Sequence, residues 1–484
     1  MVRSSSASPP DGGWVSVAVK LVGVAALVIA PLRVLRQGFL PPDDALCHAA
    51  KAVSGRDWSE ILLRRPDITV DPHPGWHAIL GVIHRGLGLS TVDLVWFSVV
   101  ACFVLYSLGP VLLLGRSEAW LLALALMCVA DPYLIWRLLE GRPYLIVSAV
   151  VPLVYILWPR LAGERPARVV AFFAACAAFT TWIHHGFYLL AFPVLGLLAA
   201  REWRAGTRLA VAFALGIMIG ALLTGHPIGY LYQSLLHAYL VVGLPKPMVV
   251  LAAELEPFEG RPQAVAAFLA LVAWRATRER NAFTPTRDPA VAMAVGGWAL
   301  GFFSQRFYFD WAVPALLALG AVGFDRALRE RLPATVPAYV LITAAPALLL
   351  VLVIGADVQA RWSNAPGPIS LSSDDPAQAE WLPDPGGIAY DTEMVLFDGL
   401  FFRNPQGPWK YVLGFEPAIM RPEDYEVFTA IHAKHGKLGA YRPWVDRMRP
   451  EDRLYIISQS TQHTQIPLQW YQPVPSLWVG RLPR

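Results

Sequence analysis

Long apolar runs, separated by short polar segments, fill the first three quarters of the chain. A helix that crosses a bilayer needs about twenty mainly apolar residues, and about eleven runs reach or approach that length. They predict a polytopic α-helical membrane domain over residues 1–355. The runs are Trp14–Leu35, Leu89–Leu114, Ala119–Trp136, Tyr144–Trp158, Val169–Ile183, Phe187–Ala200, Leu209–Thr224, Gln263–Trp274, Ala290–Phe303, Phe309–Phe324 and Val336–Gly355.

Two longer segments have the mixed pattern of a soluble protein. Residues 36–88 separate the first two runs, and residues 356–484 follow the last one. Asp375-Pro376 is typical of a helix start, with Asp as the N-cap. The second segment is therefore predicted to be a C-terminal soluble α/β domain. Its expected helices are Ala377–Leu382 and Pro422–His435, and its expected strands are Gly387–Asp391, Lys410–Phe415, Leu454–Gln459 and Leu477–Arg481.

The composition agrees with a membrane protein. Hydrophobic residues make up 55% of the chain and charged residues 16%, with a mean hydropathy of +0.45. A soluble domain carries about 25% charged residues. The net charge of +4 gives no reason to expect a nucleic-acid partner, and the four cysteines form no disulfide pattern.

The placement of cationic residues predicts the orientation, because cytoplasmic loops are rich in Lys and Arg. With a cytoplasmic N-terminus and alternating spans, fifteen arginines fall on the inner side and five cationic residues in the short outer loops. An odd number of spans then places residues 356–484 outside an inner (plasma) membrane. The inner group is Arg3, Arg116, Arg160, Arg165, Arg168, Arg201, Arg204, Arg208, Arg275, Arg278, Arg280, Arg287, Arg326, Arg329 and Arg331, and the outer group is Arg137, Arg142, Lys246, Arg261 and Arg306.

An acidic pair, Asp43-Asp44, stands at the start of the first outer loop, just beyond the first span. Two adjacent carboxylates repel each other, so one should have a raised pKa and can serve as a general base. The alternative is a simple N-cap for a helix over Ala45–Val53. In the same orientation no histidine falls in an inner loop, which indicates that the chemistry takes place on the outer side.

His48 follows the acidic pair, and the same loop ends in Asp71-Pro72-His73-Pro74-Gly75-Trp76-His77. His73 and His77 have the i, i+4 spacing of a metal-binding pair. The intervening Pro and Gly favour a helix start at His73 instead. We therefore assign no metal ligands, name no cofactor with certainty, and leave a divalent metal open.

These features together resemble the GT-C class of integral-membrane glycosyltransferases, which includes protein O-mannosyltransferases, aminoarabinose transferases and oligosaccharyltransferases. The resemblance rests on the acidic pair, the His-Pro turn, the many helices and the outer α/β domain, and it covers nearly the whole chain. It implies that Asp43 and Asp44 carry the base or metal-contact role. The class often has a His-Pro-Pro-Leu-like turn, and this chain departs from it with His73-Pro74-Gly75-Trp76.

The resemblance implies an inverting transferase that takes a sugar from a polyprenyl-phosphate donor. Such a reaction needs cations that hold the departing phosphate. Each candidate also has a plainer interpretation: a helical salt bridge between Arg137 and Glu140, interface snorkelling for Arg306, and a capped turn for the histidines. The candidate substrate contacts are His48, His73, Arg137, Glu140, Arg142, His184, His185, Lys246 and Arg306.

Two other functions remain open from the sequence. A flippase or transporter for a lipid-linked glycan would usually show paired half-repeats, and none is evident. A non-catalytic membrane scaffold would tolerate loss of the acidic pair. The expected partners are the bilayer, the lipid-linked donor and a glycan, lipid or protein acceptor, while the sugar itself is not indicated.

Overall fold

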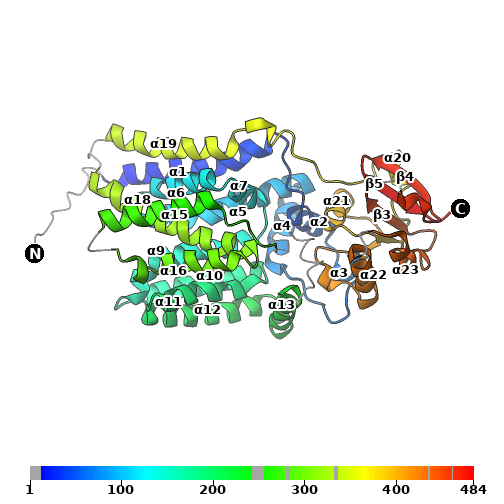
Figure 1. The fold of residues 1–484 in the computed structure, drawn as a ribbon, viewed down its shortest axis with the longest axis horizontal. Coiled ribbons are helices and arrows are strands. Elements are labelled where there is room, and N and C mark those ends of the chain that lie inside the picture. Colours follow the sequence, from blue (N-terminus) through cyan, green and yellow to red (C-terminus); the bar gives the residue numbers. More distant parts are fainter. Residues whose placement is uncertain are drawn as a thin grey trace, which may run out of the picture.

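The computed structural model describes residues 12–242, 256–279, 283–331, 336–433, 436–459 and 462–483. The molecule is elongated, with a bundle of roughly parallel helices at one end and a small mixed domain at the other (Figure 1). Helices of residues 36–88, the predicted first outer loop, lie between the two parts (Figure 1). Lys246, one of the candidate substrate contacts, lies outside the described residues.

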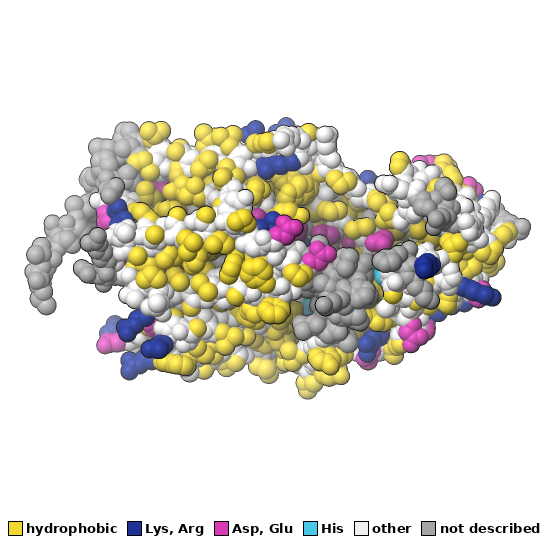
Figure 2. All heavy atoms as spheres, viewed as in Figure 1, with side chains coloured by type: hydrophobic (Ala, Val, Ile, Leu, Met, Phe, Trp, Pro, Cys, Tyr) yellow, Lys and Arg dark blue, Asp and Glu magenta, His cyan; other side chains and the backbone are white. Residues whose placement is uncertain are grey.

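Helices occupy all of the predicted spans. Within the part of the chain that the structure describes, five helical segments are long and apolar enough to cross a membrane by length and composition. Hydrophobic side chains cover the face of the bundle seen in Figure 2, while charged side chains gather toward the ends. The bundle helices are α1 Gly12–Leu35, α5 Thr91–Leu113, α6 Glu118–Ala130, α7 Tyr133–Leu139, α8 Tyr144–Ser148, α9 Val150–Ala162, α10 Ala167–Ile183, α11 Ala191–Ala199, α12 Trp203–Leu223, α15 Pro262–Arg278, α16 Pro289–Gly301, α18 Val313–Arg331 and α19 Val336–Gly355.

Some predicted spans are interrupted. The run Ala119–Trp136 is divided between α6 and α7, because Pro132 follows Asp131 and a proline cannot continue the hydrogen-bonded ladder. The run Phe309–Phe324 begins earlier than predicted, with a short helix α17 (Gln305–Phe307) and a π-helical turn η4 (Tyr308–Ala312) before α18. Such π turns are frequent at functional sites.

The first outer loop is mostly helical. It contains α2 (Asp44–Ser54), α3 (Trp58–Ile61) and α4 (Pro74–Leu87). Helix α2 is buried along most of its length, where it packs between the bundle and the C-terminal domain. A further helix, α13 (Pro227–Val242), follows α12 and exposes Ile228, Tyr232, Leu235 and Tyr239 on one stripe.

The C-terminal domain is built on a five-stranded sheet in the order β2-β1-β3-β5-β4. Strands β1, β2 and β3 are parallel, and β3, β5 and β4 are antiparallel. Four of the strands were predicted, and β4 was missed. The strands are β1 Ile388–Tyr390, β2 Lys410–Tyr411, β3 Arg453–Ile457, β4 Gln469–Val474 and β5 Leu477–Arg481. The α-helices are α20 Pro376–Ala379, α21 Met394–Arg403, α22 Pro422–Ala433 and α23 Arg442–Val445.

The first outer loop joins this sheet through its backbone. Leu62 forms an isolated parallel bridge with Tyr411 of β2, and Leu63 N–H donates to the Tyr411 carbonyl at 2.8 Å. Arg65 N–H donates to the Ile419 carbonyl at 2.9 Å. Helix α21 packs against α2 in the same interface (Figure 1). The loop and the C-terminal domain therefore share one core, although they are distant in sequence.

Candidate active site

The acidic pair lies where α1, the first outer loop and the bundle meet. Asp43 occupies the N-cap position of α2 but makes no capping hydrogen bond. Instead Arg142 Nη2 donates to Asp43 Oδ2 at 3.0 Å, and Arg142 Nε lies 3.2 Å from Asp44 Oδ2. The N-cap alternative therefore does not describe the Asp43 side chain, which pairs with a cation from another part of the chain.

The ion pair continues into a larger charged network. Glu140 accepts from Arg137 at 3.1 Å and from the Tyr144 hydroxyl at 3.1 Å, and it lies 3.7 Å from Arg142. Arg137 also lies 3.5 Å from Asp310, which accepts from Arg306 Nε at 3.1 Å. The network thus connects three stretches of chain: the first outer loop, the turn between α7 and α8, and the π turn before α18.

A glycine allows the turn between α7 and α8 to lie close to α2. Gly141 has a φ of +67°, which favours glycine. A Cβ atom at this position would lie 3.1 Å from the Val99 backbone nitrogen and 3.3 Å from the Ala45 Cβ. The residues on either side of Gly141 are Glu140 and Arg142, so this close approach places both side chains beside the acidic pair.

Asp43 has an unusual acidity. Burial raises the pKa of its carboxyl to about 7, helped by Glu140 and Asp44, although Arg142 acts in the opposite direction. Its side chain retains 22% exposure. Its Oδ1 atom is buried and accepts no hydrogen bond from the described residues. With a pKa near 7, this carboxyl is divided between its two protonation states at neutral pH.

The C-terminal domain adds a carboxyl group that the sequence analysis missed. Asp398, on α21, is 2% exposed, and its Oδ1 has no hydrogen-bond partner among the described residues. Burial and the nearby charges of Asp44 and Asp43 raise the pKa of Asp398 well above its usual range. Asp398 therefore adds a buried carboxyl that interacts electrostatically with the acidic pair and whose charged form is disfavoured. Its position 355 residues from Asp43 left no spacing signal in the sequence.

Histidines form a second cluster one helical turn beyond Asp44. The rings of His48, His73, His77, His184 and His185 lie in a chain of contacts, with centroids 4.6 to 5.9 Å apart. Burial lowers the pKa of His48 and of His73, which keeps both rings neutral at neutral pH. Among the described residues, two sets of three could hold a metal ion, and no cofactor is established. The sets are His48, His73 and His77, and His73, His184 and His185.

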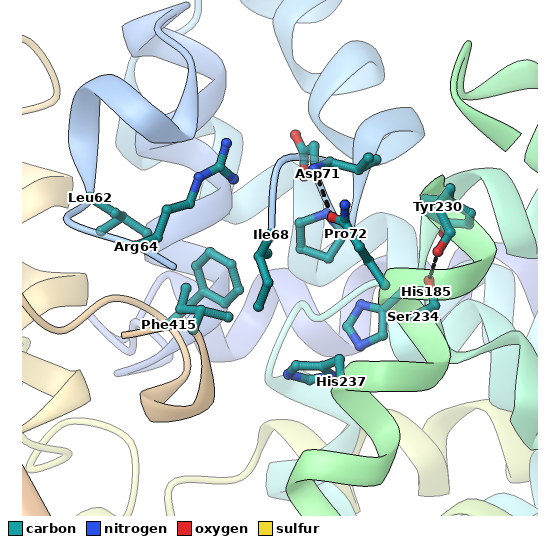
Figure 3. A pocket seen from close by; sticks show the side chains of 13 residues that line it. Leu62, Arg64, Ile68, Asp71, Pro72, His185, Tyr230, Ser234, His237 and Phe415 are labelled. Carbon is teal, nitrogen blue, oxygen red and sulfur yellow. Dashed lines mark hydrogen bonds between the residues drawn. The ribbon is translucent and has the colours of Figure 1, made fainter. Parts of the chain in front are cut away.

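A small pocket opens beside this cluster. Figure 3 shows that its wall comes from the first outer loop, from α13 and from Phe415 of the C-terminal domain. His185 and His237 face each other there with ring centroids 4.8 Å apart (Figure 3). Arg64 lies across the cavity (Figure 3). The exposed lining of the pocket is mainly apolar, with a few polar side chains at its wall, as is common for small-molecule sites.

The residues selected from the sequence fall into two neighbouring groups. Asp43, Asp44, Arg137, Glu140, Arg142 and Arg306 belong to the charged network. His48, His73, His184 and His185 belong to the histidine cluster. Asp310, Tyr144 and Asp398 were missed. Asp310 had a signal, because it stands four residues after Arg306 at the start of an apolar run.

No protein-family model matches the chain, and no curated protein matches it. Among solved structures, the chain is similar to the oligosaccharyltransferase of Archaeoglobus fulgidus, solved with a tethered acceptor peptide that contains the NVT sequon. The identity is 13%, the match covers 95% of this chain and 74% of that one, and the TM-score is 0.46. At this TM-score the likeness carries no conclusion about activity, which has to come from the site.

Proposed function

We propose that the protein is an inverting membrane glycosyltransferase that moves a sugar from a polyprenyl-phosphate donor to an acceptor on the side of the C-terminal domain. The observation that carries the proposal is the Asp43 carboxyl. It has a pKa of about 7, a buried oxygen without a hydrogen bond from the described residues, and an arginine on its other oxygen. This combination suits a general base beside an anionic leaving group.

The reaction assigns one role to each part of the network. Asp43 takes the proton from the acceptor hydroxyl or amide as its oxygen or nitrogen bonds to the anomeric carbon. The bond from that carbon to the phosphate oxygen breaks, and the electron pair leaves with the polyprenyl phosphate. Arg142, which contacts Asp43, is the cation that receives the phosphate charge. Its guanidinium group can bind two phosphate oxygens at once. Inversion follows from attack opposite the leaving group.

Arg137 and Arg306 form the part of the charged network around Asp310. Both contact Asp310, which is 2% exposed, and neither is more than 22% exposed itself. Charges that are costly to bury beside a bilayer usually serve a function. We assign these two arginines to the donor phosphate or to the orientation of Arg142 through Glu140. The sequence interpretation of Arg137 and Glu140 as a helical salt bridge holds as well, since the two are 3.1 Å apart.

A scaffold would use the same network as a structural clamp between the bundle and the C-terminal domain. The two functions differ at Asp43, because a clamp needs only a hydrogen-bonding side chain there. An uncharged amide of the same shape preserves the contact with Arg142 and cannot accept a proton. The discriminating variant is therefore Asp43→Asn.

The test is transfer by the purified protein in liposomes, with polyprenyl-phosphate sugars as donors and membranes of the source cells as acceptor. Asp43→Asn should lower the transfer rate by about 100-fold or more, as loss of a general base does. Asp67→Asn is the matched control, since Asp67 lies in the same loop, is 46% exposed and pairs with Arg65. Equal thermal melting would show that the fold is intact. Full activity of Asp43→Asn would remove the catalytic assignment.

A further inference from the structure

The histidine cluster contains a ligand set whose protonation pattern follows from its neighbours. His77 Nδ1 lies 2.6 Å from Asp71 Oδ2. A carboxylate only accepts hydrogen bonds, so the ring nitrogen Nδ1 carries the proton. The other nitrogen, Nε2, then presents a lone pair toward His48, whose Nδ1 lies 2.9 Å away. A histidine that binds a metal through one ring nitrogen usually donates a hydrogen bond from the other nitrogen to a carboxylate or a carbonyl.

His48 and His73 complete the set from two other directions. His48 comes from α2, and His73 stands at the N-cap of α4 without a capping hydrogen bond from its side chain. Their ring centroids are 4.6 Å apart, and all three residues are buried. The Nε2 atom of His48 is buried without a hydrogen bond from the described residues. Nε2 is the nitrogen that carries the proton when Nδ1 of His48 acts as a ligand.

The alternative set, His73 with His184 and His185, is weaker on the same reasoning. Gly186 N–H donates to His184 Nδ1 at 2.8 Å. A neutral imidazole whose Nδ1 accepts a hydrogen bond carries its proton on Nε2, and that nitrogen has no lone pair for a metal. His184 therefore carries its proton on Nε2. His77 carries its proton on Nδ1, which leaves its Nε2 lone pair for a metal ion.

Glycine at position 75 explains how His73 and His77 can share one site despite the Pro-Gly pair between them. A Cβ atom at Gly75 would lie 2.7 Å from the Trp182 carbonyl oxygen and closer still to the Trp182 ring. The first turn of α4 therefore packs directly on α10. This contact fixes the start of the helix, so that His73 and His77 lie one turn apart on the face toward α2.

We propose that His48, His73 and His77 bind one transition-metal ion, with Asp71 as the carboxylate behind His77. Zn²⁺ fits best, because imidazole is among its preferred ligands and three protein ligands leave a fourth position for water or a substrate oxygen. Tetrahedral Zn–N bonds of about 2.0–2.1 Å place ligand nitrogens about 3.3 Å apart. The 2.9 Å between His48 and His77 needs only a small opening, with the His48 proton moving to Nε2.

This site differs from the metal contact that the resemblance gives to Asp43 and Asp44. An ion held by carboxylates would be of the Mg²⁺ or Mn²⁺ type with octahedral oxygen ligands. An ion held by three imidazoles would be tetrahedral. Asp71, the carboxylate behind His77, also lines the neighbouring pocket together with Pro72 and His185 (Figure 3).

The test uses the full-length protein in detergent, loaded with Zn²⁺ alone or Co²⁺ alone and freed of loose metal by gel filtration. We expect about one equivalent of Zn²⁺ by elemental mass spectrometry, and a tetrahedral visible spectrum with Co²⁺. Both should be lost in His73→Asn and His48→Gln and kept in Asp43→Asn and in His226→Gln, an exposed histidine outside the cluster. Asn at position 73 keeps a residue that N-caps well.

The Asp71→Asn variant gives an independent test of the metal site in case the histidine variants fail to fold. It should keep the fold and weaken Zn²⁺ binding by about 10- to 100-fold, as loss of an outer carboxylate does. No metal on the wild-type protein, unchanged metal in the histidine variants, or loss with Asp43→Asn but not with His73→Asn would each overturn the proposal. Because the readout is metal content, it stands or falls separately from the transferase activity.

Discussion

Asp43 and Arg142 oppose each other in setting the acidity of the site. Burial, Glu140 and Asp44 raise the pKa of Asp43, and the Arg142 guanidinium lowers it. The outcome, a pKa of about 7, lies near the pH at which a general base combines an open lone pair with useful basicity. The ion pair is therefore a means of tuning the base as well as a contact.

We predict that the transfer rate at low substrate concentration rises with pH through about 7. Below that pH Asp43 holds its proton and cannot accept another, and above it the carboxylate is free to do so. In Arg142→Gln the opposing cation is gone, so the pKa of Asp43 and the rising limb should move up by about one pH unit or more. A pH–rate profile of both proteins measures this. A limb that stays in place in Arg142→Gln would contradict the assignment of Asp43 as the titrating base.

At this scale the sequence singled out several members of the charged network, because charged residues between the apolar runs are few. Asp43 and Asp44 stand out as a pair, and Arg137, Arg142 and Arg306 stand out as cations between apolar runs. What the sequence could not predict is the pairing. Arg142 is 99 residues from Asp43, and only the folded chain brings the two within 3.0 Å.

The turn between α7 and α8 is the element that connects the base to the arginines. Its position depends on Gly141, whose φ of +67° and close contact with α5 and α2 exclude a side chain. A break between Trp136 and Tyr144 was predicted, but the interruption between α6 and α7 was not, since the apolar pattern continues through Pro132. The strand β4 was missed for a related reason: its residues are mostly half-exposed and include Pro473, which weakens a strand pattern.

Gly141→Ala should displace this turn from α2. The left-handed backbone conformation alone costs about 1–2 kcal/mol for a residue with a side chain. A displacement of about 1 Å would separate Arg142 from Asp43 and lower the transfer rate by about 100-fold. Thermal melting and transfer assays measure both effects.

Gly86→Ala is the control for that variant. Gly86 is an exposed glycine in the last turn of α4, and a Cβ atom there meets no other atom within 4 Å. Its activity and melting temperature should stay at or slightly above those of the wild type, because alanine favours a helix over glycine. Equal activity of Gly141→Ala and the wild type would show that the turn does not position the site.

At the scale of the whole molecule, the site lies at one end of the helix bundle. Helix α18 begins beside Asp310 and runs about 28 Å, at 1.5 Å per residue, to the far end. There Arg116 contacts Glu118 and Asp325, and Arg326 contacts Glu279. The division at residue 355 into a membrane domain and a C-terminal domain stays a prediction. The backbone pairing of Leu62 with Tyr411 could not be predicted, because a pairing between distant segments leaves no local pattern.

The arginine-rich end should face the cytoplasm, and the C-terminal domain should be outside. A C-terminal fusion to alkaline phosphatase, which folds only after export, should be active, and a fusion to green fluorescent protein should be dark. A fluorescent, phosphatase-negative C-terminus would contradict the orientation and with it the odd number of spans. The same fusions after Arg201, in a predicted inner loop, should give the opposite pair of results.

The central claim, transfer from a lipid-phosphate sugar with Asp43 as the base, is tested most directly by native mass spectrometry of the lipids that remain bound to the purified protein. We expect the wild type to carry a polyprenyl phosphate, and Asp43→Asn to carry the same lipid with its sugar still attached, because the donor binds but is not consumed. Asp67→Asn should resemble the wild type. Only bulk phospholipid on all three proteins, even after polyprenyl-phosphate sugar is added, would contradict the account.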